Sequence, residues 1–223
     1  MTTGDLFDQW HPAPCAETIV PGATVIRGFA RAEAEALLRA VHGVATQAPF
    51  RHMITPGGHR MSVAMTNAGA AGWVSDRRGY RYQRTDPESG EPWPPMPAIF
   101  MDVARRAAAR AGFEAFTPDA CLVNRYEPGT KLSLHQDRNE HDLGHPVVSV
   151  SLGLPAIFLF GGDRRSDRPR RIRLAHGDVV VWGGPARLAF HGVAPLASGH
   201  HPAAGPHRFN LTLRKALTSS ARR

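Results

Sequence analysis

The stretch Arg208-Phe-Asn-Leu-Thr-Leu-Arg214 alternates polar and apolar side chains along its whole length. Because successive side chains of a β-strand point to opposite faces, it predicts a strand with one polar and one apolar face. An amphipathic strand at the protein surface would show the same alternation. If the polar face points inward instead, its two arginines need a bound anion, because an unpaired buried charge is costly. A dicarboxylate meets that need through charge-assisted, two-point hydrogen bonds.

Seven further strand-like runs precede this stretch, and no helical periodicity separates them. Many short strands at close spacing favour a β-sandwich or jelly roll over a parallel α/β sheet. The expected strands are residues 120–126, 132–137, 147–154, 156–160, 171–174, 179–182, 188–191 and 208–214.

The N-terminal half has a different pattern. Apolar residues at helical spacing predict helices over residues 31–47 and about 97–110. Residues 50–95 between them are rich in Gly, Pro, Arg and aromatics, which is typical of a functional lid. We therefore expect one mainly β domain with flanking helices, an α+β arrangement over residues 1–223, with its jelly-roll core at about 120–215.

The formal net charge of the 223-residue chain is +8, and arginine carries almost all of it because Lys131 and Lys215 are the only lysines. Guanidinium groups pair with two phosphate oxygens at once, so a basic surface of this kind suits a nucleic acid. Abundant Arg, Ala, Gly and Pro can equally reflect the base composition of a genome. Charge alone leaves both explanations open.

The two cysteines, Cys15 and Cys121, form no disulfide framework, so a reducing cytoplasm is the simplest location. No apolar run approaches the roughly 18 residues of a membrane span, and we expect no membrane partner. Nothing in the sequence requires more than a monomer.

Two His-x-Asp triplets occur, His135-Gln-Asp137 and His176-Gly-Asp178. Residues two apart on a strand face the same way, so either pair could hold one metal ion. The first pair ends an alternating run and is the expected metal site. Gly-Asp178 precedes a run of apolar residues, so Asp178 is expected to be a turn residue instead.

A third ligand is sought among the other histidines. His200, His201 and His207 fall in a Gly- and Pro-rich loop and are expected to be solvated. His191 follows a plausible strand, with Trp182 as a neighbouring apolar wall, and is the candidate ligand. Two imidazoles and one carboxylate make up the facial triad that holds non-haem Fe(II) with open coordination positions.

Asn124-Arg-Tyr126 adds an amide and a phenol on one face of an earlier strand. Together with the histidines, the aspartate and the arginines, this pattern resembles the AlkB family of Fe(II)/2-oxoglutarate dioxygenases. The likeness covers roughly residues 20 to 215. It extends to Thr55-Pro-Gly-Gly, Met61-Ser-Val-Ala-Met-Thr-Asn67, Val148-Ser-Val-Ser-Leu-Gly-Leu-Pro155 and His176-Gly-Asp-Val-Val-Val-Trp-Gly-Gly184.

The resemblance implies a double-stranded β-helix (a cupin-like jelly roll) with an N-terminal nucleotide-recognition lid. It implies Fe(II) held by His135, Asp137 and His191, with 2-oxoglutarate and O2 as co-substrates. Arg208 would bind the far carboxylate of 2-oxoglutarate, and Arg214 would lie nearer the metal. The full set of implied 2-oxoglutarate contacts is Asn124, Tyr126, Arg208, Asn210 and Arg214.

On the substrate side, the lid interleaves Trp73, Tyr80 and Tyr82 with arginines, which suits a flipped base and its phosphates. By resemblance, Trp73 stacks on the base with the His135 imidazole opposite. Ordinary packing is the alternative for each aromatic residue. Arg165 is a candidate contact to base or backbone, with a solvated loop charge as the alternative.

One departure from the family bears on specificity. Family members commonly carry an acid shortly after the ligand aspartate, where this chain has Asn139. The amide accepts a hydrogen bond from an exocyclic amine but lacks the charge that favours a cationic base.

The expected activity is oxidative demethylation of 1-methyladenine and 3-methylcytosine in DNA, single- or double-stranded, or in RNA. This direct repair of alkylation damage would release formaldehyde, succinate and CO2. The alternatives are a 2-oxoglutarate-dependent hydroxylase of a protein or small molecule, and a non-catalytic basic domain that binds nucleic acid. The basic, aromatic lid favours the first reading.

Overall fold

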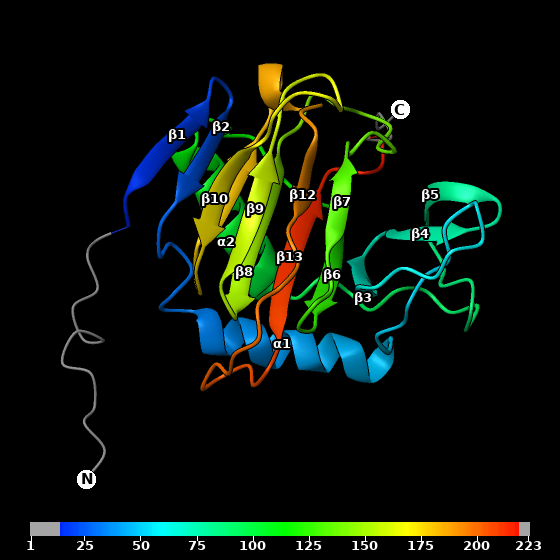
Figure 1. Cartoon of the computed structure of the whole chain (residues 1–223). Coiled ribbons are helices and arrows are strands. Elements are labelled where there is room, and N and C mark those ends of the chain that lie inside the picture. The colour runs from blue at the N-terminus through cyan, green and yellow to red at the C-terminus, as the bar shows by residue number, and fades with distance from the viewer. Residues whose placement is uncertain (1–13, 219–223) are drawn as a thin grey trace, which may run out of the picture.

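The computed structural model describes residues 14–218, so residues 1–13 and 219–223 of the expected domain lie outside the described residues. Two antiparallel sheets face each other, and two helices cover the outer face of the larger sheet (Figure 1). The larger sheet has the strand order β1-β2-β11-β8-β13-β6-β3, and the smaller has the order β10-β9-β12-β7.

Eight of these strands form the jelly roll expected from the sequence, four in each sheet. The larger sheet contributes β6 (Ala120–Tyr126), β8 (Val147–Gly153), β11 (Val179–Trp182) and β13 (Arg208–Arg214). The smaller sheet consists of β7 (Leu132–His135), β9 (Ala156–Phe160), β10 (Arg170–Leu174) and β12 (His191–Val193).

The strand expected at residues 188–191 is wrong in its bounds. The short 3-10 helix η1 (Gly184–Ala186) comes just before it, and the Ala189 amide donates to the Ala186 carbonyl at 3.0 Å. Residues 188–190 therefore complete a turn, and strand β12 begins at His191.

Three strands that the sequence pattern did not predict widen the larger sheet. They are β1 (Ala16–Val20) and β2 (Ala23–Ile26) at one edge and β3 (Ala64–Gly69) at the other. Five of the six residues of β3 are buried, so both faces are covered and the polar–apolar alternation of a half-exposed strand is absent. The range 50–95 expected to be a lid thus includes one strand of the main sheet.

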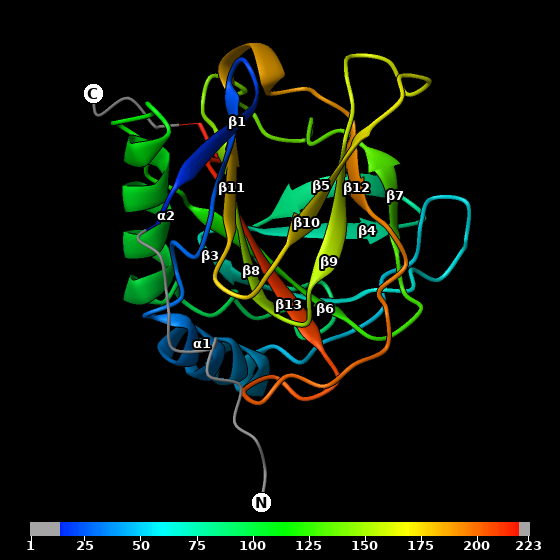
Figure 2. The ribbon, with the colours of Figure 1, turned by 60° about the vertical axis from the view of Figure 1, so that its left-hand side comes forward.

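A separate two-stranded hairpin follows, made of β4 (Gly72–Asp76) and β5 (Gly79–Gln83). It stands outside both sheets, beside β3 and β6 (Figures 1 and 2). This hairpin carries Trp73, Tyr80 and Tyr82, the three aromatics of the expected lid.

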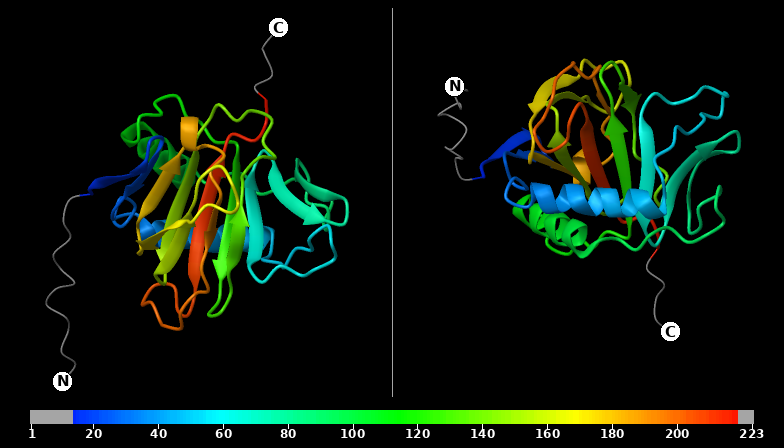
Figure 3. Two further views of the ribbon diagram at one scale, coloured as in Figure 1. Left: turned by 45° about the horizontal axis from the view of Figure 1, so that its top comes forward. Right: turned by 90° about the horizontal axis from the view of Figure 1, so that it is seen from below.

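The core has two layers, one on each face of the larger sheet. Helices α1 (Ala34–Gln47) and α2 (Ala98–Arg110) lie side by side on the outer layer (Figure 3). Both helices fall within the ranges expected from the sequence. A glycine with φ of +88°, Gly112, follows the end of α2, where a left-handed residue lets the chain turn away.

Strand β13 divides the two layers as its alternation predicts. Phe209, Leu211 and Leu213 pack into the helix-side core. The polar side chains of β13 consequently face the space between the two sheets, where Tyr126 and Trp182 also lie. Neither helix of the described part of the chain is long and apolar enough to cross a membrane.

We expect Leu211→Ala to lower the free energy of unfolding by about 2–5 kcal/mol, because Leu211 is fully buried between the sheet and the helices. Leu188→Ala is the matched control: its side chain is 40% exposed, so its cost should stay within about 0.5 kcal/mol. Equilibrium denaturation by urea measures both. Equal costs for the two variants would contradict the assigned core.

Candidate functional site

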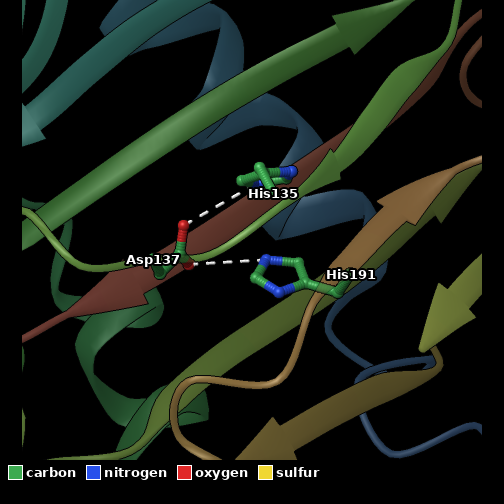
Figure 4. A group of neighbouring side chains, drawn as sticks. All are labelled: His135, Asp137 and His191. Carbon is green, nitrogen blue, oxygen red and sulfur yellow. Dashed lines mark ion pairs between the residues drawn. The ribbon is translucent and has the colours of Figure 1, made fainter. Parts of the chain in front are cut away.

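The smaller sheet brings two histidines together. Strand β7 ends at His135 and strand β12 begins at His191, and these residues are direct partners in the antiparallel register. Opposite residues of such a pair point to the same face, and the two ring centroids are 4.4 Å apart. Asp137 follows His135 by two residues, just beyond the end of the strand, and points toward both rings (Figure 4).

The candidate ligand atoms of these three residues converge. Nε2 of His135 is 3.7 Å from Oδ1 of Asp137, Nε2 of His191 is 3.7 Å from Oδ2, and all three ligand atoms lie within 4.8 Å of one another. Each Nδ1 contacts a backbone carbonyl, that of Ser133 at 2.9 Å and that of Ala189 at 3.0 Å. A carbonyl only accepts hydrogen bonds, so each Nδ1 carries the proton and each Nε2 presents a lone pair to a metal.

The charge states also suit a cation. Burial, together with the neighbouring His135 ring, lowers the pKa of His191 to about 4, so this imidazole is neutral near pH 7. Burial acts to raise the pKa of Asp137, but Arg214 and then the two histidines hold it well below its usual range. The set is therefore two imidazoles, of which that of His191 is neutral, and one carboxylate, the donor types of an Fe(II) facial triad.

Two buried arginines hold Asp137 in place. Arg214 donates from Nε and Nη2 to Oδ2 of Asp137 at 2.8 and 2.6 Å. Arg187 donates from Nη1 to the Asp137 backbone carbonyl at 2.6 Å. Burial acts to lower the pKa of Arg214, but Asp137 and other nearby acidic groups raise it well above its usual range. Arg214, expected to contact 2-oxoglutarate, is thus bound to the candidate metal ligand Asp137 while also lining the cavity.

A buried carboxyl group, Glu140, joins the same two arginines. Its Oε2 is 3.1 Å from Nη2 of Arg187 and its Oε1 is 3.4 Å from Nε of Arg214. The hydroxyl of Tyr82 donates to Oε1 at 2.7 Å. Burial raises the pKa of Tyr82 well above 10, so the hydroxyl stays protonated. Tyr82 was expected among the substrate contacts, but it faces this network and does not line the cavity.

The expected co-substrate residues lie on the polar face of two neighbouring strands, β6 and β13. Arg208 of β13 is only 1% exposed, and its guanidinium carbon lies 4.9 Å from the Tyr126 ring centre. Nη2 donates to the Ser151 hydroxyl at 3.1 Å, but Nε and Nη1 have no hydrogen-bond partner among the described residues. Burial lowers the pKa of Arg208. Two unpaired donors on a buried cation fit the two oxygens of a carboxylate.

The side-chain amides of Asn210 and Asn124 differ in how many of their hydrogen-bonding groups already have partners in the protein. Asn210 donates from Nδ2 to the Ser149 hydroxyl at 2.8 Å and to the Val150 carbonyl at 3.0 Å, and its Oδ1 accepts from Thr212 at 2.9 Å. Asn124 donates weakly to the same Oδ1 at 3.4 Å, while its own Oδ1 is buried without a partner in the described chain. Asn210 therefore links β13 to β8 by hydrogen bonds, whereas Asn124 has a carbonyl oxygen at the cavity wall that accepts no hydrogen bond from the described residues.

The three candidate metal ligands and the five expected co-substrate residues line one cavity of about 650 Å³, a volume typical of a small-ligand site. At its mouth the rings of Trp73 and Tyr80 stack, with centroids 5.6 Å apart and planes inclined by 12°. Nε1 of Trp73 donates to Oδ1 of Asn139 at 3.2 Å. Arg165 lines the same cavity, so four of the five expected substrate residues meet there.

The second His-x-Asp triplet lies elsewhere, as the sequence indicates. Asp178 accepts from the Gly28 amide at 2.8 Å and from Arg27 at 3.0 Å, and it closes a turn with Ala175. His176 accepts from the Gly153 amide at 2.9 Å and stacks on His201, with ring centroids 4.3 Å apart. His201, expected to be solvated, is therefore packed.

Several residues of the cavity wall and of the network behind it were not predicted. Glu140 and Arg187 carry no sequence signal, because their roles depend on contacts made only in the folded chain. Ser149 and Ser151 alternate with valines in β8, which is a signal that marks a polar inner face. The cavity is also lined by the basic residues Arg60, Lys131 and Arg138.

Comparison with known proteins agrees with this geometry. The model of the 2OG-Fe(II) oxygenase superfamily, whose members use Fe(II), 2-oxoglutarate and O2, matches residues 22–214. The alpha-ketoglutarate-dependent dioxygenase AlkB of Salmonella typhimurium is 58% identical over 212 residues, covering 95% of this chain and 97% of that protein. The tRNA demethylase abh1 of Schizosaccharomyces pombe is 36% identical over 133 residues, covering 58% of this chain and 43% of its own length.

Among solved structures, OsALKBH1 superposes with a TM-score of 0.80 at 29% identity, covering 90% of this chain and all of that one. The relative that is 58% identical and the superfamily match both extend over nearly the whole described chain. The chain therefore belongs to the AlkB family of the 2OG-Fe(II) oxygenase superfamily.

Proposed function

We propose that this enzyme oxidatively removes N-methyl groups from 1-methyladenine and 3-methylcytosine in single-stranded DNA. Double-stranded DNA and RNA are the alternative polymers. The products would be the repaired base, formaldehyde, succinate and CO2, and the enzyme would work in the cytoplasm as a monomer. The observation that carries the proposal is the Trp73–Tyr80 stack beside basic residues, at the mouth of the cavity that holds the triad.

His135, Asp137 and His191 would hold Fe(II). Their convergence within 4.8 Å, the lone pairs on both Nε2 atoms and the depressed pKa of Asp137 support this assignment. When bound, Fe(II) supplies the oxidising chemistry together with 2-oxoglutarate and O2. The residues of this chain supply position, charge compensation and exclusion of water.

Arg208 would bind the far carboxylate of 2-oxoglutarate. Its free Nε and Nη1 donors, buried beside the Tyr126 ring, support this role because a carboxylate satisfies both at once. Asn124, Asn210 and Tyr126 would shape the pocket around the co-substrate. Arg214 would act mainly through Asp137, since its Nε and Nη2 atoms already donate hydrogen bonds to that carboxylate.

The base would stack on Trp73 with the His135 imidazole on its other side, since both side chains line the cavity. Base–aromatic stacking contributes on the order of 1–3 kcal/mol and tolerates any base. Arg60, Lys131, Arg138 and Arg165 also line the cavity, and no hydrogen bond or ion pair engages their side-chain charges within the described residues. Cations without protein partners are available to the phosphates that flank a flipped nucleotide.

The first test is formaldehyde release from an oligonucleotide carrying 1-methyladenine, with Fe(II), 2-oxoglutarate and O2 present. We expect turnover by the wild type and a fall to the no-enzyme background in His135→Ala, because the variant loses a metal ligand. His200→Ala, at an exposed loop position, should match the wild type. Succinate formation without formaldehyde across a panel of methylated DNA and RNA would favour a hydroxylase of proteins or small molecules.

Arg208→Met should raise the KM for 2-oxoglutarate by roughly 10- to 100-fold, because a charge-assisted hydrogen bond contributes about 1.5–3 kcal/mol. The KM for the oligonucleotide should change little. Arg125→Met is the control on the neighbouring strand β6: that side chain pairs with Glu127 and lies over Phe50, away from the cavity. Steady-state kinetics with each substrate varied in turn provides the measurement. A wild-type KM for 2-oxoglutarate in Arg208→Met would refute the role.

Asn139→Asp should favour cationic bases, because it adds a negative charge where the neutral amide now accepts from Trp73. A hydrogen bond to a charged group exceeds a neutral one by about 1 kcal/mol, so kcat/KM for 1-methyladenine should rise about fivefold. A neutral lesion such as 1-methylguanine serves as the internal comparison. An equal change for cationic and neutral lesions would show that Asn139 does not set the ranking.

A further inference from the structure

The hairpin and the metal-ligand loop are joined at two consecutive positions. Trp73 of β4 and Tyr82 of β5 are direct partners in the hairpin register and so share a face. Trp73 donates from Nε1 to Asn139 at 3.2 Å, and Tyr82 donates from its hydroxyl to Glu140 at 2.7 Å. The first contact lies at the cavity wall, whereas the second lies behind it.

The contact behind the cavity wall continues to the metal ligand. Glu140 is buried and pairs with Arg187 at 3.1 Å and with Arg214 at 3.4 Å. Those arginines bind the backbone carbonyl and the Oδ2 atom of Asp137, respectively. One hydroxyl on the hairpin is thus linked to a metal ligand through a single carboxyl group and two guanidinium groups.

The balance of charges in this network explains how Glu140 can affect metal binding at Asp137. Asp137 and Glu140 carry two negative charges against the two positive charges of Arg187 and Arg214. If Glu140 is lost or displaced, Asp137 alone faces both guanidinium groups, and the local field becomes less favourable to a metal cation. A buried network that loses one partner is strongly affected because the remaining charges are uncompensated.

We propose that Tyr82 and Glu140 are positioning residues that couple the hairpin carrying Trp73 and Tyr80 to the metal ligand Asp137, so that a base bound at the hairpin tightens metal binding. The inference rests on the proposed function, which assigns Asp137 to the metal and Trp73 to the base. Thermodynamic linkage makes the coupling reciprocal: a bound metal raises the affinity for the methylated strand by the same factor.

The test uses the full-length apoenzyme and Co(II), a redox-stable probe of an Fe(II) site. Co(II) affinity and its visible absorption are measured with and without an oligonucleotide carrying 1-methyladenine, in the absence of O2. The ratio of the two affinities is the coupling factor. A merely structural role for Tyr82 would leave this ratio and the cobalt spectrum unchanged.

We expect the oligonucleotide to raise Co(II) affinity in the wild type, and Tyr82→Phe to abolish most of that rise because it removes only the hydroxyl. Glu140→Gln should lower Co(II) affinity by roughly 10- to 100-fold even without the oligonucleotide, as is typical when a group that holds a metal ligand is lost. The double variant should bind Co(II) no more weakly than Glu140→Gln, because both changes act on one network.

Ser75→Ala is the matched control. Ser75 also anchors the hairpin by a hydroxyl, which donates to the Ile54 carbonyl at 2.7 Å, but it has no contact with the Asp137 network. This variant should keep the wild-type coupling factor. Circular dichroism and thermal melting establish that each variant is folded, and Tyr82→Phe preserves the packed ring.

The outcomes separate the two proposals. Co(II) binding by the wild type and its loss in His135→Ala support the metal site independently of Tyr82. With that site intact, a coupling factor in Tyr82→Phe equal to that of the wild type, or no coupling in the wild type, overturns the role of Tyr82 and Glu140. Failure of the wild type to bind Co(II) overturns the metal assignment itself.

Discussion

Asp137 is the group on which the electrostatics of the space between the sheets depends. It faces the two imidazoles of His135 and His191 on one side and accepts two charge-assisted hydrogen bonds from Arg214 on the other. The carboxylate thus compensates a buried guanidinium while it stays in position for the proposed metal ion. Isolated charges in such a place would be prohibitively costly, so the acid and the arginine require each other.

The same reasoning distinguishes the two arginines of β13. Arg214 has an acid partner within the protein, whereas the partners of Arg208 among the described residues are hydroxyl groups, and its Nε and Nη1 donors have no hydrogen-bond partner there. Both are equally deep, so burial alone does not separate a structural arginine from a binding one. The hydrogen-bond partners do separate them, and they favour Arg208 as the anion-binding residue of the proposed function.

Strand alternation was enough to predict the jelly roll, because six of its eight strands agree with their expected bounds to within one residue. Periodicity was not enough for β3, where both faces are buried and no alternation remains. The start of β12 could not be predicted either, because backbone hydrogen bonds close the turn after η1. Such bonds do not depend on side-chain type, so the sequence pattern does not reveal them.

For the candidate site, a spacing of two residues correctly predicted that His135 and Asp137 face one spot, although Asp137 lies beyond the end of β7. The sequence context indicated His191, the alternation of residues 208–214 indicated the two arginines, and the resemblance supplied the individual co-substrate roles. Tyr82 shows where such inference ends. It shares a face with Trp73, so sequence spacing treats the two alike, yet one lines the cavity and the other reaches behind it to Glu140. Depth within the fold depends on neighbouring segments, which neither periodicity nor composition encodes.

Arg214 also limits the denticity of Asp137. Its Nε and Nη2 together occupy the two lone pairs of Oδ2, leaving Oδ1 as the oxygen with both lone pairs available. A carboxylate restrained in this way would offer a bound cation one oxygen instead of two. An aspartate that does not chelate would leave room for small exchangeable ligands.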